Sequence, residues 1–125
     1  MRLLLDTHIL LWVLAGDKRA AQIKDMILAQ DTQVFVSAAC WWELAIKIGI
    51  GKLDYKLADL RQAAKDSNFK ELPVTGEHTE VLETLPPVHK DPFDRLLVCQ
   101  AITEPMKLIT ADSKMAGYSE LIWKI

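Results

Sequence analysis

Short, mostly apolar runs that each give way to a helical pattern are the feature that most limits how this chain can fold. The runs lie at 2–6, 34–36, 71–74, 107–110 and 121–123. Between them, apolar residues recur at spacings of three and four, as in amphipathic helices. Strands that are apolar on both faces and alternate with helices predict a parallel sheet that is covered on both sides. We therefore expect an α/β protein, a three-layer α/β/α sandwich around a parallel five-stranded sheet.

The helical segments between these strands have recognisable starts and stops. Ser37 is a residue that favours the N-cap of a helix, and Gly49 is a residue at which a helix ends. Pro73 is typical of a strand at the edge of a sheet. We expect helices at about 8–15, 18–30, 38–48, 57–66, 77–85, 92–103 and 112–117.

Chain length and composition limit the class of protein. With 125 residues and no linker or internal repeat, the chain is expected to form a single domain over 1–125. No apolar run is long enough to cross a membrane and no signal peptide is recognisable, which predicts a cytoplasmic protein. Cys40 and Cys99 are expected to be core thiols. The net charge of −2 gives no nucleic-acid-binding signature, although two bound divalent cations would change it to +2.

Acidic residues stand where apolar strands end. Asp6 closes the first strand, and Asp112 follows the strand at 107–110. In a parallel sheet such positions converge on one edge, where α/β folds bind their ligands. Each residue could instead be a helix N-cap, a common position for aspartate. Carboxylates gathered at one edge repel one another unless protons or cations lie between them, so they predict a site for a hard divalent metal ion.

Glu43 is a single acid in a helix that is apolar on nearly every face. A buried glutamate needs a partner or a function. Lys47 lies one turn later, so a structural ion pair is the alternative to a role in the metal site. The same helix carries Trp41 and Trp42, which point about 100° apart. Because both cannot face one core, we expect one of them at an interface with a second subunit or another protein.

Asp91 and Asp94 are close in sequence, but the chemistry of helix starts separates them. Asp91 precedes Pro92, and proline is favoured at the first helical position, so Asp91 is the predicted N-cap. Asp94 falls one turn into the helix, where the helix dipole favours an ionised carboxylate. We therefore expect Asp91 to be structural and Asp94 to be catalytic. His8 and His89 flank these acids and are expected to be solvated loop residues.

Four stretches of the chain, taken together, resemble PIN-domain ribonucleases and, more narrowly, the VapC-type toxins of bacterial toxin–antitoxin pairs. They are Leu-Leu-Asp-Thr-His at 4–8, Val-Ser-Ala at 36–38 with Trp-Glu-Leu-Ala-Ile-Lys at 42–47, the Asp-Pro-Phe-Asp-Arg string within 89–97, and Leu-Ile-Thr-Ala-Asp at 108–112. Their order and spacing fit the family along the whole chain. Met115 is the main departure, because an aromatic residue often stands at that place.

The resemblance implies an endoribonuclease that cleaves single-stranded RNA and uses Mg²⁺ or Mn²⁺ as its cofactor. Asp6 and Asp94 would be the most direct metal ligands, and the other two acids would hold a second ion or a bound water. Whether one ion or two are used stays open. The implied acidic site has four members: Asp6, Glu43, Asp94 and Asp112.

The resemblance also assigns supporting residues and partners. Ser37 and Asp91 would support the acidic site, and Lys47 and Arg95 would contact the RNA. The partners implied are an RNA substrate, a cognate antitoxin protein and a second copy of the chain. Larger assemblies with the antitoxin are compatible with this pattern.

Two other classes of protein could also have an acidic pocket. A receiver-like signalling module gathers acids at strand ends, but it needs two adjacent acids after the first strand, where this chain has Leu4 and Leu5 before Asp6. The other class is a PIN domain that has lost catalysis and only binds RNA or protein. The presence of all four acids argues against it.

Overall fold

A parallel sheet forms the centre of the computed structural model, which describes residues 1–125. Its order is β3-β2-β1-β4-β5, and each neighbouring pair of strands is parallel. The predicted five-stranded parallel sheet is therefore confirmed. Receiver-like domains have the order 2-1-3-4-5, so the topology excludes that alternative. The strands are β1 (Arg2–Leu5), β2 (Gln33–Ser37), β3 (Lys70–Leu72), β4 (Lys107–Thr110) and β5 (Ile122–Lys124).

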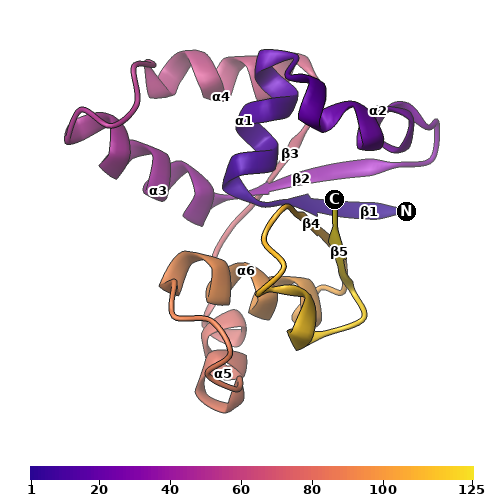
Figure 1. Ribbon diagram of the computed structural model, residues 1–125, viewed down its shortest axis with the longest axis vertical. Coiled ribbons are helices and arrows are strands. Elements are labelled where there is room, and N and C mark those ends of the chain that lie inside the picture. Colours follow the sequence, from indigo (N-terminus) through magenta and orange to yellow (C-terminus); the bar gives the residue numbers. More distant parts are fainter.

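Helices cover both faces of this sheet, as the three-layer prediction requires. Figure 1 shows α1, α2 and α4 above the strands and α5 and α6 below them. β3 lies at one edge of the sheet, as predicted from the proline that follows it. No helix is long and apolar enough to span a membrane. The helices are α1 (Thr7–Ala15), α2 (Ala21–Leu28), α3 (Ala38–Gly49), α4 (Leu57–Asp66), α5 (Gly76–Thr84) and α6 (Pro92–Thr103).

Two predicted helices are shorter than expected. The segment predicted at 18–30 begins with the 3₁₀ turn η1 (Lys18–Ala20), and the regular helix ends at Leu28. The segment predicted at 112–117 has only the 3₁₀ turn η2 (Ala116–Tyr118). Its backbone bonds close turns of three residues, from the Met115 N–H to the Asp112 oxygen at 3.1 Å and from the Ala116 N–H to the Ser113 oxygen at 3.3 Å. This is the tighter 3₁₀ pattern, which is used in short pieces.

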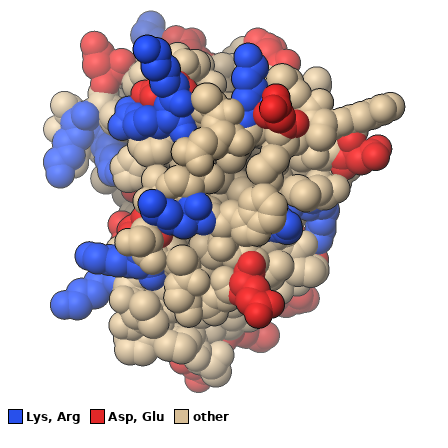
Figure 2. All heavy atoms as spheres, turned by 45° about the vertical axis from the view of Figure 1, so that its right-hand side comes forward, with Lys and Arg blue, Asp and Glu red and all other residues tan.

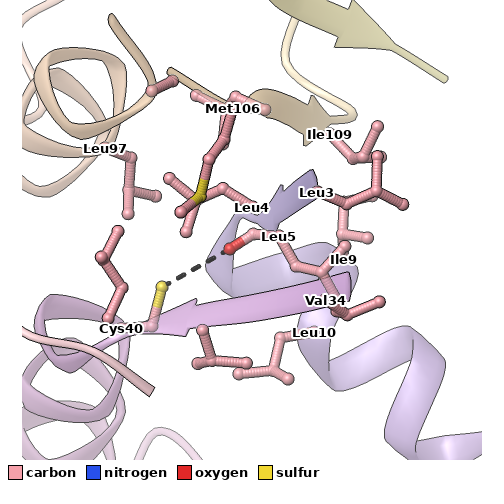
Figure 3. Packing of buried hydrophobic residues seen from close by; sticks show 14 of the residues in the cluster. Leu3, Leu4, Leu5, Ile9, Leu10, Val34, Cys40, Leu97, Met106 and Ile109 are labelled. Atoms are coloured by element: carbon pink, nitrogen blue, oxygen red, sulfur yellow. Dashed lines mark hydrogen bonds between the residues drawn. The ribbon is translucent and has the colours of Figure 1, made fainter. Parts of the chain in front are cut away.

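The core is built around the leucines of β1. Figure 3 shows Leu3, Leu4 and Leu5 between Ile9 and Leu10 of α1 on one side and Leu97 and Met106 on the other. Leu3, Leu4 and Leu5 have no exposed surface, which matches a central strand covered on both faces. The first strand is therefore fixed by burial of apolar surface on two sides.

Both cysteines are free and buried, so the prediction of two core thiols is confirmed. The Cys40 Sγ lies 3.7 Å from the backbone oxygen of Leu5 (Figure 3). Burial raises the pKa of the Cys40 thiol to about 12, so this thiol stays protonated and acts as a small core side chain.

The surface carries charges of both signs. In Figure 2, Lys and Arg side chains lie mostly toward the left of the face shown, and Asp and Glu side chains are scattered over it, several of them beside basic ones. A formal net charge of −2 agrees with this mixture. Attraction of a polyanion by overall charge is therefore weak, and any site for one must use local groups.

Candidate metal centre

A hollow of about 340 Å³ opens at the carboxyl ends of β1 and β4. β1 and β4 are the strands at which the chain order of the sheet reverses, and α/β sheets bind ligands outside such a switch point. The hollow collects three of the four predicted acids, but not Glu43. It is lined by Asp6, His8, Trp12, His89, Asp91, Asp94, Ala111 and Asp112.

Asp6 both caps α1 and lines the hollow, so the two interpretations of this residue are compatible. Its Oδ1 accepts a hydrogen bond from the Ile9 N–H at 2.9 Å, and its Oδ2 accepts one from the Thr110 hydroxyl. Burial raises the pKa of Asp6, against the lowering by these two hydrogen bonds. Thr110 was not among the predicted site residues. The available signal was its position at the end of a strand, two residues before Asp112.

Asp91 is the N-cap of α6, as predicted. Its Oδ1 accepts hydrogen bonds from the N–H groups of Phe93 at 2.9 Å and Asp94 at 3.2 Å. The side chain also reaches the hollow, so its negative charge acts on the other acids there. Asp91 therefore caps the helix and contributes to the field of the site.

The helix dipole was expected to favour the ionised form of Asp94, but the pKa of this carboxyl group lies above its usual value, so it ionises less readily than a free aspartate. Burial, followed by the negative charge of Asp91, raises the pKa of Asp94 to about 6. Asp6 acts in the same direction, while the hydrogen bond from His89 opposes it. Loss of hydration and repulsion between acids therefore outweigh the helix dipole, whose effect on one charge is only about 0.3–1 kcal/mol.

His89 is not the solvated loop residue that the sequence predicted. Its side chain is 14% exposed, and its Nε2 lies 2.8 Å from Asp94 Oδ2 and 3.1 Å from Asp112 Oδ2. His8 lines the same hollow and is exposed, as expected. No periodicity or spacing in the sequence separates these two histidines, because the contacts of His89 with Asp94 and Asp112 depend on the folded loop.

Glu43 lies behind the hollow in a buried hydrogen-bonded pair. Its Oε1 accepts from the Thr7 hydroxyl at 2.6 Å, and its Oε2 lies 2.8 Å from the Lys47 Nζ. The alternative of an ion pair with Lys47 is therefore confirmed. Glu43 still raises the pKa of Asp6 through its charge, although less than burial does. Its role as a metal ligand stays a prediction.

The other predicted supporting residues form hydrogen bonds with backbone groups or an ion pair with Glu43 and do not line the hollow. Ser37 caps α3 by accepting from the Ala39 N–H at 3.0 Å, and this hydrogen bond does not involve a carboxylate. Arg95 donates to the backbone oxygens of Leu85, Pro86 and His89 at 3.0–3.3 Å. Neither Arg95 nor Lys47 lines the hollow, so their contact with RNA stays a prediction.

The donors in the hollow suit a hard divalent cation. His89, Asp94 and Asp112 offer ligand atoms that lie within 4.8 Å of one another. Burial raises the pKa of Asp94, and repulsion from the charges of Asp91 and Asp6 raises it further. A cation coordinated by carboxylate oxygens removes this repulsion, and Mg²⁺ and Mn²⁺ both favour such ligands. The residues present therefore fit the implied metal.

Comparison with known proteins supports one family. A sequence profile described as the PIN domain matches residues 3–121. No curated protein sequence matches the chain significantly.

Solved structures with a similar fold are also known. They include VapBC2 from Rickettsia felis, bound to a DNA fragment from its promoter, with a TM-score of 0.73 and 19% identity over 98% of this chain and 96% of that one. A toxin–antitoxin complex from Klebsiella pneumoniae has a TM-score of 0.68 and 20% identity over 98% of both chains. FitAcB from Neisseria gonorrhoeae has a TM-score of 0.71 and 17% identity, covering 98% and 96%. At these identities the likeness is one of fold.

The cap made by Asp91 can be measured by a pair of substitutions. Both Asp91→Ser and Asp91→Ala remove the charge, but only serine keeps an oxygen that can accept from the start of α6. We expect Asp91→Ala to have a free energy of unfolding about 1 kcal/mol lower than Asp91→Ser. Urea unfolding of the metal-free proteins measures this difference. Equal stabilities of the two variants would show that the cap contributes nothing.

The raised pKa of Asp94 predicts how stability depends on pH. The Asp94 carboxyl group binds its proton more tightly in the folded protein than in the unfolded chain, so the contribution of Asp94 to stability without metal falls as pH rises from about 4 to about 6. We expect Asp94→Asn to raise the free energy of unfolding by about 1 kcal/mol near neutral pH, a value reduced for partial exposure of the side chain.

The effect of Asp94→Asn should disappear below about pH 4, where the carboxyl group is neutral in both states. Thermal unfolding of wild type and variant in chelator, over this pH range, gives the comparison. A wild type that is as stable as the variant near neutral pH would contradict the raised pKa.

Proposed function

Because the chain belongs to the PIN-domain family, we propose that it is a divalent-metal-dependent endoribonuclease and the toxin of a toxin–antitoxin pair. The observation that carries this proposal is the convergence of Asp6, Asp94 and Asp112 on one hollow at the switch point of the sheet. Three carboxylates from separate parts of the chain have no structural need of one another. A cation that all three coordinate would be a physical reason for them to lie close together.

Each acid of the hollow is held by the fold in a way that suits metal binding. Asp6 is oriented by Ile9 and Thr110, and Asp112 accepts from the Lys114 N–H at 2.9 Å. Asp6 and Asp94 are the proposed direct ligands of Mg²⁺ or Mn²⁺. Asp112 and Glu43 complete the acidic site, holding a second ion or a water. When bound, the cation supplies Lewis acidity at a phosphodiester and activates water for hydrolysis.

An RNA substrate fits the hollow when the cation is present. Two divalent ions would change the formal net charge from −2 to +2, which removes the repulsion of a polyanion. Trp12 contributes an aromatic wall to the same hollow. Unpaired bases stack on such side chains, whereas bases in a duplex are already stacked. These features support single-stranded RNA as the substrate.

Solved structures with a similar fold support the proposed biological role. The structure from K. pneumoniae is described as a toxin–antitoxin complex, and VapBC2 from R. felis shares its name with the VapC-type toxins that the sequence resembles. We propose the same kind of pair for this chain, with a cognate antitoxin protein as its partner and a cytoplasmic location. The single domain over 1–125 is the toxin, and the profile match spans nearly all of it.

The proposed homodimer rests on an apolar face of α3. Trp41 is 8% exposed and Trp42 is 62% exposed, so the two tryptophans do point to different surroundings. Ile46 is 42% exposed and Ile50 is 63% exposed. Together with Trp42 they recur every fourth residue, with Ile50 at the C-cap that ends α3, so they lie along one side of this segment. Such an apolar stripe is typical of a surface covered by a protein partner, and we propose a second copy of the chain.

Metal-dependent cleavage is the direct test of the proposed activity. We expect purified protein to cleave single-stranded RNA with Mg²⁺ or Mn²⁺ and to stop when chelator is in excess. Asp6→Asn should lower the rate by about two orders of magnitude or more while keeping the fold, because asparagine also caps helices well. Asp54→Asn, an exposed acid outside the hollow, is the matched control. Full activity in excess chelator would contradict the mechanism.

Light scattering at micromolar concentration tests the dimer. We expect twice the mass of one chain for the wild type and a shift toward the monomer for Trp42→Ser, because an exposed tryptophan is a common anchor of interfaces. Leu28→Ser removes another exposed apolar side chain, 69% exposed on α2, and should leave the mass unchanged. A monomeric wild type, alone and with antitoxin, would count against the dimer.

A further inference from the structure

His89 joins two acids that come from different elements. Asp94 belongs to α6, and Asp112 lies in the loop after β4. The Nε2 of His89 contacts an oxygen of each, at 2.8 Å and 3.1 Å. A donor between two carboxylates weakens their repulsion and fixes their relative orientation. The imidazole ring therefore influences the distance and relative orientation of the Asp94 and Asp112 carboxylates, which lie on different elements.

The backbone next to His89 indicates which ring nitrogen carries the proton. The Lys90 N–H donates to Nδ1 at 3.1 Å. A nitrogen that accepts a hydrogen bond carries no proton, so we assign the proton of the neutral ring to Nε2. The Nε2–H then donates to Asp94 Oδ2, and Asp112 Oδ2 lies 3.1 Å from the same nitrogen. In this tautomer Nε2 has no lone pair for a cation, so the ring acts on the carboxylates and not on the metal directly.

His89 is also held in place by groups that are independent of the two acids. The backbone N–H of His89 donates to the Tyr118 hydroxyl oxygen at 2.6 Å. Arg95 Nη1 donates to the His89 backbone oxygen at 3.3 Å and to the Tyr118 hydroxyl at 3.2 Å. Arg95 in turn anchors the loop through the oxygens of Leu85 and Pro86. The backbone position of His89 is thus fixed independently of the contacts between its ring and the two carboxylates.

Both carboxylates keep oxygen lone pairs for a cation. His89 takes up one oxygen of each, and a carboxylate offers about four lone-pair sites in all. The Asp94 Oδ1 has no hydrogen bond of its own, whereas the Asp112 Oδ1 accepts one from the Lys114 N–H. Binding of His89 and binding of a cation are therefore compatible on the same two acids.

We propose that His89 is a positioning residue, whose Nε2–H holds Asp94 and Asp112 in the arrangement that binds the divalent cation. This role rests on the proposed metal-dependent function and extends it to a residue outside the four acids. Groups that hydrogen-bond to metal ligands typically contribute about 10–100-fold to metal affinity. The Arg95–Tyr118 pair contributes indirectly, because it fixes the backbone that carries the ring.

Mn²⁺ affinity, followed by the electron paramagnetic resonance signal of the free ion, tests this role. We expect His89→Leu to weaken Mn²⁺ binding about tenfold or more, because it removes the donor. His89→Gln puts an amide N–H near the place of Nε2–H and should stay within roughly threefold of wild type. Asp54→Asn, the exposed acid outside the hollow, is the control and should not weaken binding.

A second variant covers the case in which leucine disturbs the loop. His89→Asn is polar but too short to reach both carboxylates, and it should bind Mn²⁺ as weakly as the leucine variant. Circular dichroism and urea unfolding establish that each variant is folded. Wild-type affinity in the folded leucine or asparagine variant would overturn the positioning role.

Pulsed spectroscopy of the bound Mn²⁺ separates a positioning residue from a metal ligand. We expect no coupling to a directly coordinated histidine ¹⁴N in the wild type. A coupling that is present in the wild type and lost in His89→Gln would overturn the assignment, since His89 would then be a ligand.

RNA cleavage gives the last distinction. In His89→Leu the Mn²⁺ concentration for half-maximal activity should rise, while the rate at saturating Mn²⁺ should stay near that of wild type. A lower maximal rate with unchanged Mn²⁺ dependence would mean that His89 contacts the substrate, and would overturn the role. If the wild type neither binds Mn²⁺ nor cleaves RNA, the proposed function itself fails. If the wild type does both and the leucine variant binds equally well, only the role of His89 fails.

Discussion

The parallel pairing of β1 with β4 is the contact on which the site depends. Leu5 pairs with Ile109, and the ladder continues one residue further through the bond from the Asp6 N–H to the Ile109 oxygen at 3.1 Å. The Thr110 hydroxyl then reaches the Asp6 carboxylate. Since the strands are parallel, Asp112 follows β4 at the same edge. A shift of one residue would turn each side chain to the other face of the sheet and disperse the acids.

The same core that fixes β1 also makes the site unfavourable without a ligand. Buried leucines bring Asp6 into a desolvated position, where burial raises its pKa. Asp94 has its pKa raised to about 6 by burial and by the charge of Asp91. Hydrogen bonds from Thr110 and His89 oppose these shifts in part. The free energy stored in this repulsion favours binding of a cation, so burial of the strand and affinity for metal are linked.

The sequence was sufficient for the fold, because each strand and helix is set by local apolar periodicity and by caps such as Ser37 and Asp91. It also found the acids, since strand ends of a parallel sheet share an edge. It did not reveal the contacts of His89 or the raised pKa of Asp94. These depend on burial and on the folded loop that brings His89 to Asp94 and Asp112, which periodicity does not report. The short turn at η2 was missed because its backbone bonds close turns of three residues instead of the four of an α-helix.

The proposed function requires a divalent cation between the acids at the carboxyl ends of β1 and β4. Anomalous diffraction from crystals soaked in Mn²⁺ would locate such an ion. We expect a single dominant site, or a close pair, with carboxylate oxygens of Asp6 and Asp94 at roughly 2.0–2.6 Å from the ion. Crystals that diffract well, accept Mn²⁺ elsewhere and show no anomalous peak in the hollow would contradict it.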